Sequence, residues 1–259
     1  MEGVIRLSVT SVLQVKLAEN EVELNRALRL RYEVFVEEEG NAQLHSSDRL
    51  ESDDYDLFCD HLLVFDGTPE HVVGTYRLLP GIRAMNHIGF YSETEFSLNQ
   101  SNVARAEILE LGRSCVHPRY RDGQVIQKLW EGIAAYIQNK PFRYLIGCAS
   151  LPHHLLSNLN QIYSLLVHNQ VITFEYGVSP LPTHRIPELT IEPLRINERE
   201  LFRKLPPLLK GYQWLGAKIA GEPAFDPIFQ TIDFLIVLDK EKISQRYRKK
   251  FITARDEHV

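Results

Sequence analysis

A carboxylate, a glycine and a guanidinium interrupt the apolar strand pattern "ELGRSCV", at Glu110, Gly112 and Arg113. In a regular strand, Glu110 and Gly112 would share one face and Arg113 would lie on the other. A glycine inside a strand often marks a bulge, which would re-aim its neighbours and leave backbone N–H groups unpaired. Such N–H groups can stabilise the oxyanion of a tetrahedral intermediate. The pattern therefore favours an acyl-transfer site.

The strand is followed by the turn "HPRYRDG" and by a helix pattern that starts near Gln124. The N-terminus of a helix offers unpaired N–H groups and a positive dipole, which suit a phosphate group. Arg119 and Arg121 lie beside this helix start and would strengthen such a site. The alternative is a simple connection in which Asp122 caps the helix.

Further charged residues precede this unit. Arg31 lies one helical turn before Phe35, so both would face the same cleft. Asp53 and Asp56 could order a lid or meet a cationic side chain, but aspartates in such loops more often cap turns. Arg77 could bind a substrate carboxylate, orient an acyl donor, or satisfy a buried carboxylate.

The composition is that of a globular protein and excludes some classes of function. The 259 residues are 44% hydrophobic and 24% charged, with a net charge of −5, so bulk charge does not favour nucleic-acid binding. The segment 37–60 holds nine acidic residues and one arginine, whereas the tail from Lys240 onward is basic. These are either solvated surfaces, or an attraction for a cationic substrate and a surface for an acidic partner.

The cysteines and histidines lack the spacing of a metal site. Cys59, Cys115 and Cys148 form no CxxC motif and are odd in number, which fits reduced thiols in a cytosolic protein. His61, His117 and the pair 153–154 have no ligand-like spacing, so we expect no metal. Ser114 is not in a nucleophile elbow. Cys115 leaves a covalent acyl-enzyme as a weak alternative to direct transfer.

Periodicity predicts an α/β architecture, a mixed sheet flanked by helices. A helix capped by Asn20 precedes a hairpin that turns at "DGTP", and "FRYLIGCAS" and "TIDFLIVL" are later strands. The prolines of 180–193 indicate an extended connection. Pro206-Pro207 would start a helix that closes near Gly221. We expect one domain over 1–259, elaborated at about 152–230 and ending in a basic tail, 240–259.

Several motifs resemble known acyltransferases. "VHPRYR" and the helix after it resemble the strand-turn-helix signature of the GNAT superfamily, which binds pantetheine and pyrophosphate. "LRYEVF", "DDYD", "GTYRLLP" and "ELGRSCV" follow one another as in the acyl-homoserine-lactone synthases. A closer likeness is to the ornithine-acyl carrier protein N-acyltransferase family. It lies in "DLFCDHLLVFD", "VVGTYRLL", "GFYSETEF", "ELGRSCVHPRYRDG", "LIGCAS", "LPPLLKGYQWLGA" and "FQTIDFLIVLD".

This resemblance implies a GNAT-like fold and a bacterial enzyme of ornithine-lipid synthesis. A long-chain, 3-hydroxylated acyl group would pass from acyl carrier protein to the α-amine of an amino acid, ornithine first among them. Glu110 would be the general base rather than a carboxylate paired with Arg77 or Arg113, with Arg113 beside it as a catalytic residue. The remaining candidates are substrate-binding residues, Arg31, Phe35, Asp53, Asp56 and Arg77, and donor-binding residues, Ser114, Cys115, Val116, Arg119, Arg121 and Gly123.

The implied donor carries 4′-phosphopantetheine, so no other cofactor is expected. Acyl carrier protein is acidic and would dock on basic surface near Arg119, Arg121 and Lys128. The sequence has no leader and no apolar run long enough to span a bilayer, which predicts a cytoplasmic protein. Because the product is an amphiphile, we expect transient membrane contact through the basic tail and "GYQWLGA". Trp214 itself fits a core position better.

Two other functions stay open. A coenzyme A-dependent N-acetyltransferase would use the same strand-turn-helix unit. Asp122, Gln124 and Ile126 stand where the glycine-rich consensus would place glycines, which argues against that donor. A non-catalytic module that binds acyl carrier protein or lipid is the second alternative, and the presence of Glu110 and Arg113 argues against it.

Overall fold

The computed structural model describes residues 12–98 and 103–243. Within them a nine-stranded mixed sheet has the order β1-β2-β3-β5-β6-β11-β9-β7, with β10 added on β11. The strands of this sheet are β1 (Leu13–Leu17), β2 (Asp60–Asp66), β3 (Val72–Pro80), β5 (Ile108–Val116), β6 (Tyr144–Pro152), β7 (Ile172–Thr173), β9 (Lys218–Ala220), β10 (Ala224–Asp226) and β11 (Thr231–Asp239). β4 (Phe96–Ser97) and β8 (Ser179–Pro180) form a separate pair.

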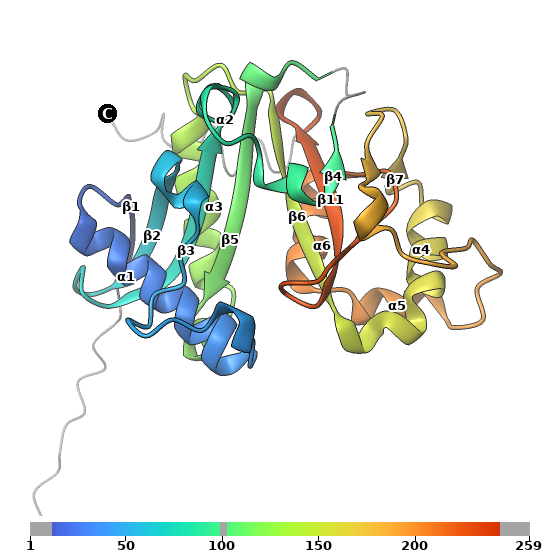
Figure 1. The fold of residues 1–259 in the computed structure, drawn as a ribbon, viewed down its shortest axis with the longest axis horizontal. Coiled ribbons are helices and arrows are strands. Elements are labelled where there is room, and N and C mark those ends of the chain that lie inside the picture. Colours follow the sequence, from blue (N-terminus) through green and yellow to red (C-terminus); the bar gives the residue numbers. More distant parts are fainter. Residues whose placement is uncertain (1–11, 99–102, 244–259) are drawn as a thin grey trace, which may run out of the picture.

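Six α-helices flank the sheet in the described part of the chain. They are α1 (Glu21–Tyr32), α2 (Gly81–Asn86), α3 (Gln124–Ile137), α4 (Leu159–His168), α5 (Glu198–Lys204) and α6 (Pro207–Leu215). The α1 helix continues as one π-helical stretch, Glu33–Glu38. The predicted mixed sheet with flanking helices is therefore confirmed (Figure 1).

Local signals account for the N-terminal elements. The side chain of Asn20 accepts a hydrogen bond from the amide of Glu23, so it caps α1 as the sequence predicts. β2 and β3 pair antiparallel around the Asp66-Gly67-Thr68-Pro69 turn, where Gly67 has φ 71°. The apolar stripe of α3 packs on one face of the sheet, while α1 and α2 cover the other (Figure 1).

Two details of the C-terminal half correct the sequence-based predictions. The α6 helix starts at Pro207 as predicted but ends before Gly216, whose φ of 96° forms the left-handed cap. Lys218–Ala220, which the predicted helix would have included, form β9 instead. Trp214 is 59% exposed and is not a core residue. The core side of α6 instead consists of Leu209, Tyr212 and Leu215.

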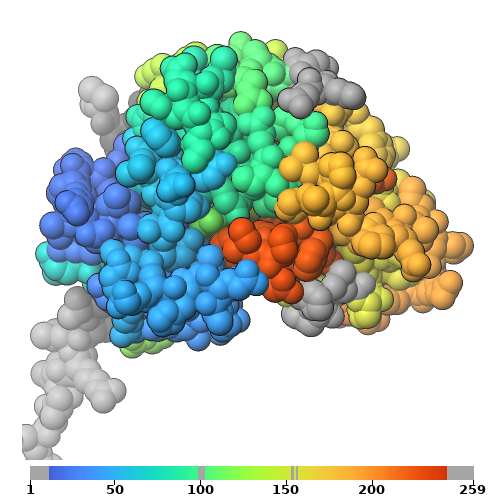
Figure 2. Space-filling model, in the orientation of Figure 1, coloured from blue at the N-terminus to red at the C-terminus, as the bar shows by residue number. Residues whose placement is uncertain are grey.

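The segments before and after residue 152 both contribute strands to this sheet. A loop between β10 and β11 reaches across the front of the molecule, from the C-terminal half to the N-terminal half (Figure 2). Its carbonyl groups at Pro227 and Ile228 accept hydrogen bonds from Gln43 and Asn41. The basic tail predicted over 240–259 lies outside the described residues from 244 onward.

Candidate active site

The strands β5 and β6 diverge in the middle of the sheet. They pair in parallel only from Ile108 to Glu110, which lie opposite Tyr144 to Ile146 (Figure 1). Gly147 comes next on β6, and a Cβ there would lie 2.3 Å from the carbonyl oxygen of Leu111. Beyond this contact the two strands no longer form a ladder with each other. Glu110 therefore stands at the point of divergence.

The predicted bulge is present in β5. Gly112 lies opposite Arg77 and Cys115 opposite Thr75, so Arg113 and Ser114 together face the single residue Tyr76. Arg113 has φ 49°, a left-handed conformation that is rare for a residue with a side chain. The bulge turns the Arg113 guanidinium toward Asp53, which a regular alternation would not predict.

Glu110 is buried, with 4% of its surface exposed. Its two carboxylate oxygens accept hydrogen bonds from the backbone amides of Tyr91, at 2.7 Å, and Ser92, at 2.8 Å. Burial raises the pKa of Glu110 above its ordinary value, and these amides and the charge of Arg77 offset only part of the rise. No ion pair with Glu110 forms within the described residues. The geometry thus differs from the alternative in which Arg77 or Arg113 pairs with it.

Three arginines and three carboxylates form one ion-pair network beside Glu110. Its members come from α1 (Arg31), β3 (Arg77), β5 (Arg113) and the segment before β2 (Glu51, Asp53 and Asp56). Asp56 accepts bidentate hydrogen bonds of 2.7 and 3.1 Å from Arg31. Asp53 accepts hydrogen bonds of 2.5 Å from Arg77 and 2.8 Å from Arg113. The network joins four separate segments at the site.

The carboxylates of the network are already paired with other groups of the protein. Asp53 caps the turn Asp54–Phe58, and Asp56 bonds back to the amide of Asp53, as expected for capping aspartates. Burial opposes ionisation of Asp56, but the charge and hydrogen bonds of Arg31 outweigh it and hold its pKa well below the usual range. Sequence reasoning missed Glu51, which pairs with both Arg31 and Arg113. Only its place in the acidic segment pointed to it.

Aromatic rings enclose the Arg113 guanidinium. It lies 4.5 Å from the ring centroid of Tyr91 and 4.7 Å from that of Phe229, which belongs to the loop between β10 and β11. Phe35 packs edge-on against Phe229, with ring centroids 5.7 Å apart. Phe35 is therefore half-buried at the border of the site, while Arg31, one helical turn before it, is fully buried in the network.

The turn after β5 has its polar groups largely paired. Arg121 binds the carbonyl of Val116 and both oxygens of Glu38, at 2.7 Å each. Asp122 accepts a hydrogen bond from the amide of Gln124 and so occupies the start of α3. Gly123 has φ 99° and forms the N-cap. A pyrophosphate group would have to compete with the carboxylate of Asp122 for these N–H groups.

The residues directly after the bulge do not resemble a nucleophilic site. Cys115 is buried against α1, and burial raises the pKa of its thiol far above the ordinary value. A thiolate, not a thiol, is the nucleophile in covalent catalysis. Ser114 has Tyr76 as a hydrogen-bond partner. This environment favours direct transfer over the covalent alternative.

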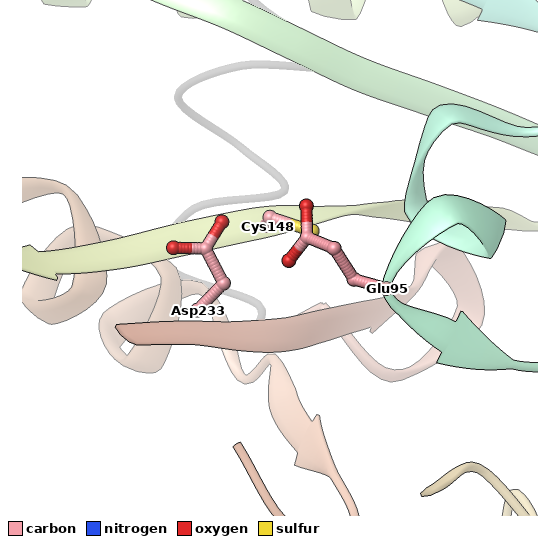
Figure 3. A group of neighbouring side chains, drawn as sticks. All are labelled: Glu95, Cys148 and Asp233. Carbon is pink, nitrogen blue, oxygen red and sulfur yellow. The ribbon is translucent and has the colours of Figure 1, made fainter. Parts of the chain in front are cut away.

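A second cluster of acidic side chains lies on the same face of the sheet. Glu95, Cys148 and Asp233 place their oxygen and sulfur atoms within 4.8 Å of one another, and their side chains point into one space (Figure 3). Sequence reasoning did not select Glu95 or Asp233. The sequence did contain a signal for Asp233, which interrupts the apolar strand pattern "TIDFLIVLD" as Glu110 interrupts its own strand.

Known proteins with similar sequences match this chain over most of its length. Residues 30–131 match the acetyltransferase (GNAT) domain. The L-ornithine N(alpha)-acyltransferase of Brucella abortus is 37% identical over 246 residues, which cover 91% of this chain and 87% of the relative. The enzyme of that name from Rhizobium meliloti is 38% identical, over 91% of this chain and 82% of the relative. This chain belongs to the L-ornithine N(alpha)-acyltransferase family. It is therefore a GNAT-type acyltransferase, as the sequence motifs indicated.

The fold is that of a wider group. The CoA-dependent acyl-homoserine lactone synthase BjaI, solved with SAM and isopentyl-CoA, superposes with a TM-score of 0.53. Its sequence is 17% identical, and the match covers 93% of this chain and 87% of that chain. At this identity the likeness shows the fold alone. The predicted relation to acyl-homoserine-lactone synthases is confirmed at that level.

Proposed function

We propose that this member of the family transfers a long-chain 3-hydroxyacyl group from acyl carrier protein to the α-amine of ornithine. The product is a lyso-ornithine lipid, an amphiphile with a free carboxylate. Membership of the family supports the reaction class and the acceptor. The observation that carries the proposal is the buried carboxylate of Glu110, which stands where β5 and β6 diverge.

The proposed chemistry is direct transfer. An amino acid carries its α-amine as an ammonium group at neutral pH, so a base must remove a proton before attack. Glu110 takes this proton, and the raised pKa caused by burial brings the carboxylate closer to the working range. The amine then attacks the thioester carbonyl, a C–N bond forms, and the C–S bond breaks. The departing thiolate takes up the second proton that the attacking nitrogen loses as the amide forms.

The ion-pair network has a positioning role in this proposal. Arg113 sits in a strained bulge and is held by Glu51 and Asp53, so its orientation is largely determined before substrate binds. The β5–β6 ladder ends at Glu110, so backbone N–H groups at the bulge and farther along β6 are not used in pairing these two strands. They are suited to stabilise the oxyanion of the tetrahedral intermediate.

Acyl carrier protein is the proposed donor, rather than coenzyme A. The carboxylate of Asp122 stands at the N-terminus of α3, where it would repel a pyrophosphate. Phosphopantetheine on a carrier protein has no pyrophosphate and needs no such cradle. Docking of the acidic carrier would use Arg119, which forms no ion pair within the described residues, unlike Arg121 and Lys128.

Mass spectrometry of the reaction products tests this function. Purified protein is incubated with 3-hydroxyacyl carrier protein, or with acetyl-CoA, and with single amino acids. N-acyl-ornithine formed from the carrier protein supports the proposal. Acetylation from acetyl-CoA alone would make the protein a coenzyme A-dependent acetyltransferase. Carrier binding without any product would indicate a non-catalytic module.

The proposal also places the enzyme in the cytoplasm, with transient contact to the membrane surface. None of the helices in the described residues is long and apolar enough to cross a membrane. Trp214 on α6 is exposed, and exposed tryptophan favours the polar-apolar boundary of a bilayer. Co-sedimentation with anionic vesicles that weakens in Trp214→Ala would support this contact, and unchanged sedimentation would exclude α6 as its site.

A further inference from the structure

Glu95 has an environment that the proposed reaction has not yet used. It follows the turn Tyr91–Thr94, whose amides bind Glu110, and only 2% of its surface is exposed. Neither of its carboxylate oxygens has a hydrogen-bond partner. A buried carboxylate without a partner is costly to keep, because it loses hydration and gains nothing in exchange. The burial of Glu95 and its missing hydrogen bonds therefore favour a ligand at this position.

The surroundings of Glu95 are acidic. Asp233 on β11 is 4% exposed, and its carboxylate points toward the same space as that of Glu95 (Figure 3). Burial raises the pKa of Glu95 far above its ordinary value, and the nearby charges of Asp233 and Asp226 raise it further. Burial likewise raises the pKa of Asp233. Two buried carboxylates of this kind hold either a shared proton or a cation.

A positive charge that acts on this cluster is already paired with other carboxylates. Arg113 lowers the pKa of both Glu95 and Asp233, but its guanidinium donates hydrogen bonds to Glu51 and Asp53. Glu110 adds a further acidic group that acts on Glu95. When both carboxylates are ionised, the space between them therefore has an excess of negative charge, which a cationic ligand would balance.

Strand register places this cluster on the face that carries Glu110. Ile146 is the partner of Glu110 in the parallel ladder, and Cys148 lies two residues farther along β6 with its side chain on the same face. Asp233 pairs with Ser150, two residues farther again. An acceptor whose α-amine lies at Glu110 could therefore extend its side chain along β6 toward Glu95 and Asp233.

We propose that Glu95 and Asp233 bind the side-chain ammonium group of the acceptor and make the enzyme selective for dibasic amino acids. This inference rests on the proposed acyl transfer to an amino acid. An alkylammonium group has three N–H donors and no acceptor, which matches two carboxylates and a third polar neighbour such as the Cys148 thiol. Asp226, whose Oδ1 is held by the amides of Ile228 and Phe229, adds negative charge nearby.

The first test compares two acceptors that differ only in the side-chain amine, L-ornithine and L-norvaline. We expect the wild-type enzyme to prefer ornithine by roughly 1,000-fold in kcat/KM, because norvaline leaves the buried carboxylates unpaired. Glu95→Gln and Asp233→Asn should raise the KM for ornithine about 100-fold and leave acylation of norvaline almost unchanged. Asp239→Asn is the matched control, because Asp239 is equally buried on β11 but pairs with Arg143.

Binding of ornithine without any acyl donor is the second test, and it does not depend on catalysis. Calorimetry in buffers of different ionisation enthalpy should show proton release at pH 7, because the ammonium group favours the ionised carboxylates. Glu95→Gln should lose both the release and the increase in melting temperature caused by ornithine. Equal loss of activity on both acceptors in the two variants would indicate a structural role and overturn the inference.

Two other results are distinguishable. A stoichiometric metal in the purified protein, lost in Cys148→Ala, would identify a metal site and overturn the inference. Absence of any acylated amino acid would count against the proposed function, and calorimetry with ornithine and norvaline would still decide whether the acidic site recognises an ammonium group.

Discussion

At the scale of single residues, the site contains carboxylates in contrasting environments. Glu110 accepts two backbone N–H groups, Asp56 is bound by Arg31 and Arg77, and Glu95 has no partner. The pKa of Asp56 is lowered, whereas the pKa values of Glu110 and Glu95 are raised by burial. Side chains of one chemical type can therefore take separate roles in structure, proton transfer and recognition.

The proposed base gives a prediction at this scale. Glu110→Gln should lower kcat by about 100-fold to 10,000-fold, because no carboxylate remains to take the proton. In the wild type, kcat/KM should rise with pH through the raised pKa of Glu110, since the base must be ionised. Steady-state rates from pH 5 to about 9 measure both effects.

Glu110→Asp is the matched variant, because it keeps a carboxylate and should retain more activity than Glu110→Gln. Both variants need a melting-temperature measurement, since Glu110 also holds the amides of Tyr91 and Ser92. Full activity in a folded Glu110→Gln protein would exclude this residue as the base.

At the scale of elements, the divergence of β5 and β6 depends on a close approach at Gly147. A Cβ at this position would lie 2.3 Å from a backbone oxygen, and backbone cannot move as a flexible side chain can. The bulge at Arg113 acts on the other strand of the pair. A small residue on one strand and an extra residue on the other thus set where the ladder ends.

We predict that Gly147→Ala lowers the free energy of unfolding by about 1–3 kcal/mol and reduces activity as well, because β6 must move away from Leu111. Urea denaturation and the acyl-transfer assay measure the two effects. Gly211→Ala is the control, because a Cβ there meets open space in α6 and should stabilise the helix by about 0.5–1 kcal/mol. Equal stability of the two variants would contradict the prediction.

The ion-pair network gives a prediction for the elements it joins. Asp56→Asn should lower the free energy of unfolding by about 3–5 kcal/mol, because Arg31 and Arg77 keep their buried charges. The pKa of Asp56 is lowered in the folded protein, so its contribution is present above the unfolded-state value of about 3.9. That contribution is lost as the pH falls below this value, and the variant should lose less stability on acidification.

Denaturation curves at pH 7 and at lower pH measure this difference. Glu37→Gln is a suitable control, because Glu37 pairs with Arg49 on the surface and should contribute about 1 kcal/mol or less. The prediction fails when the two variants lose the same amount of stability.

At the scale of the whole molecule, the acidic segment 37–60 is largely neutralised by the protein's own arginines. Most carboxylates of the acidic segment 37–60 pair with arginines of the protein, including Glu38 with Arg121 and Asp60 with Arg83. The segment therefore stabilises the N-terminal half more than it attracts a cationic substrate. The carboxyl group without a hydrogen-bond partner lies deeper, at Glu95.

Docking of the carrier protein is predicted at this scale. Arg119→Glu should raise the KM for the acyl carrier protein about 10-fold, with kcat and the melting temperature almost unchanged, because a surface charge reverses. The effect should weaken in high salt. Arg195→Glu is the control, since Arg195 is an exposed arginine in the C-terminal half. An unchanged KM in Arg119→Glu would exclude this surface as the docking site.

The sequence by itself determined most of the helices and strands and most of the site residues around Glu110. Local signals such as the Asn20 cap, the Asp66-Gly67 turn and the periodicity of 124–137 are physical properties of neighbouring residues, so they could be read without a structure. The bulge near Gly112 was predictable for the same reason. Motif order also indicated Arg31, Asp53, Asp56, Arg77, Glu110 and Arg113, which the fold brings together or close to one another.

Only the tertiary structure decided which carboxylates of the site are paired and that Glu95, which the sequence did not indicate, has no hydrogen-bond partner. Glu51 joins the network, and Glu95 meets Asp233, through strand register and chain crossings that join segments far apart in the sequence. The end of α6 at Gly216 and the exposure of Trp214 also depend on what packs against them. Burial and pairing are properties of the assembled sheet. They decide whether a carboxylate is suited to stabilise the fold, to transfer a proton or to bind a cation.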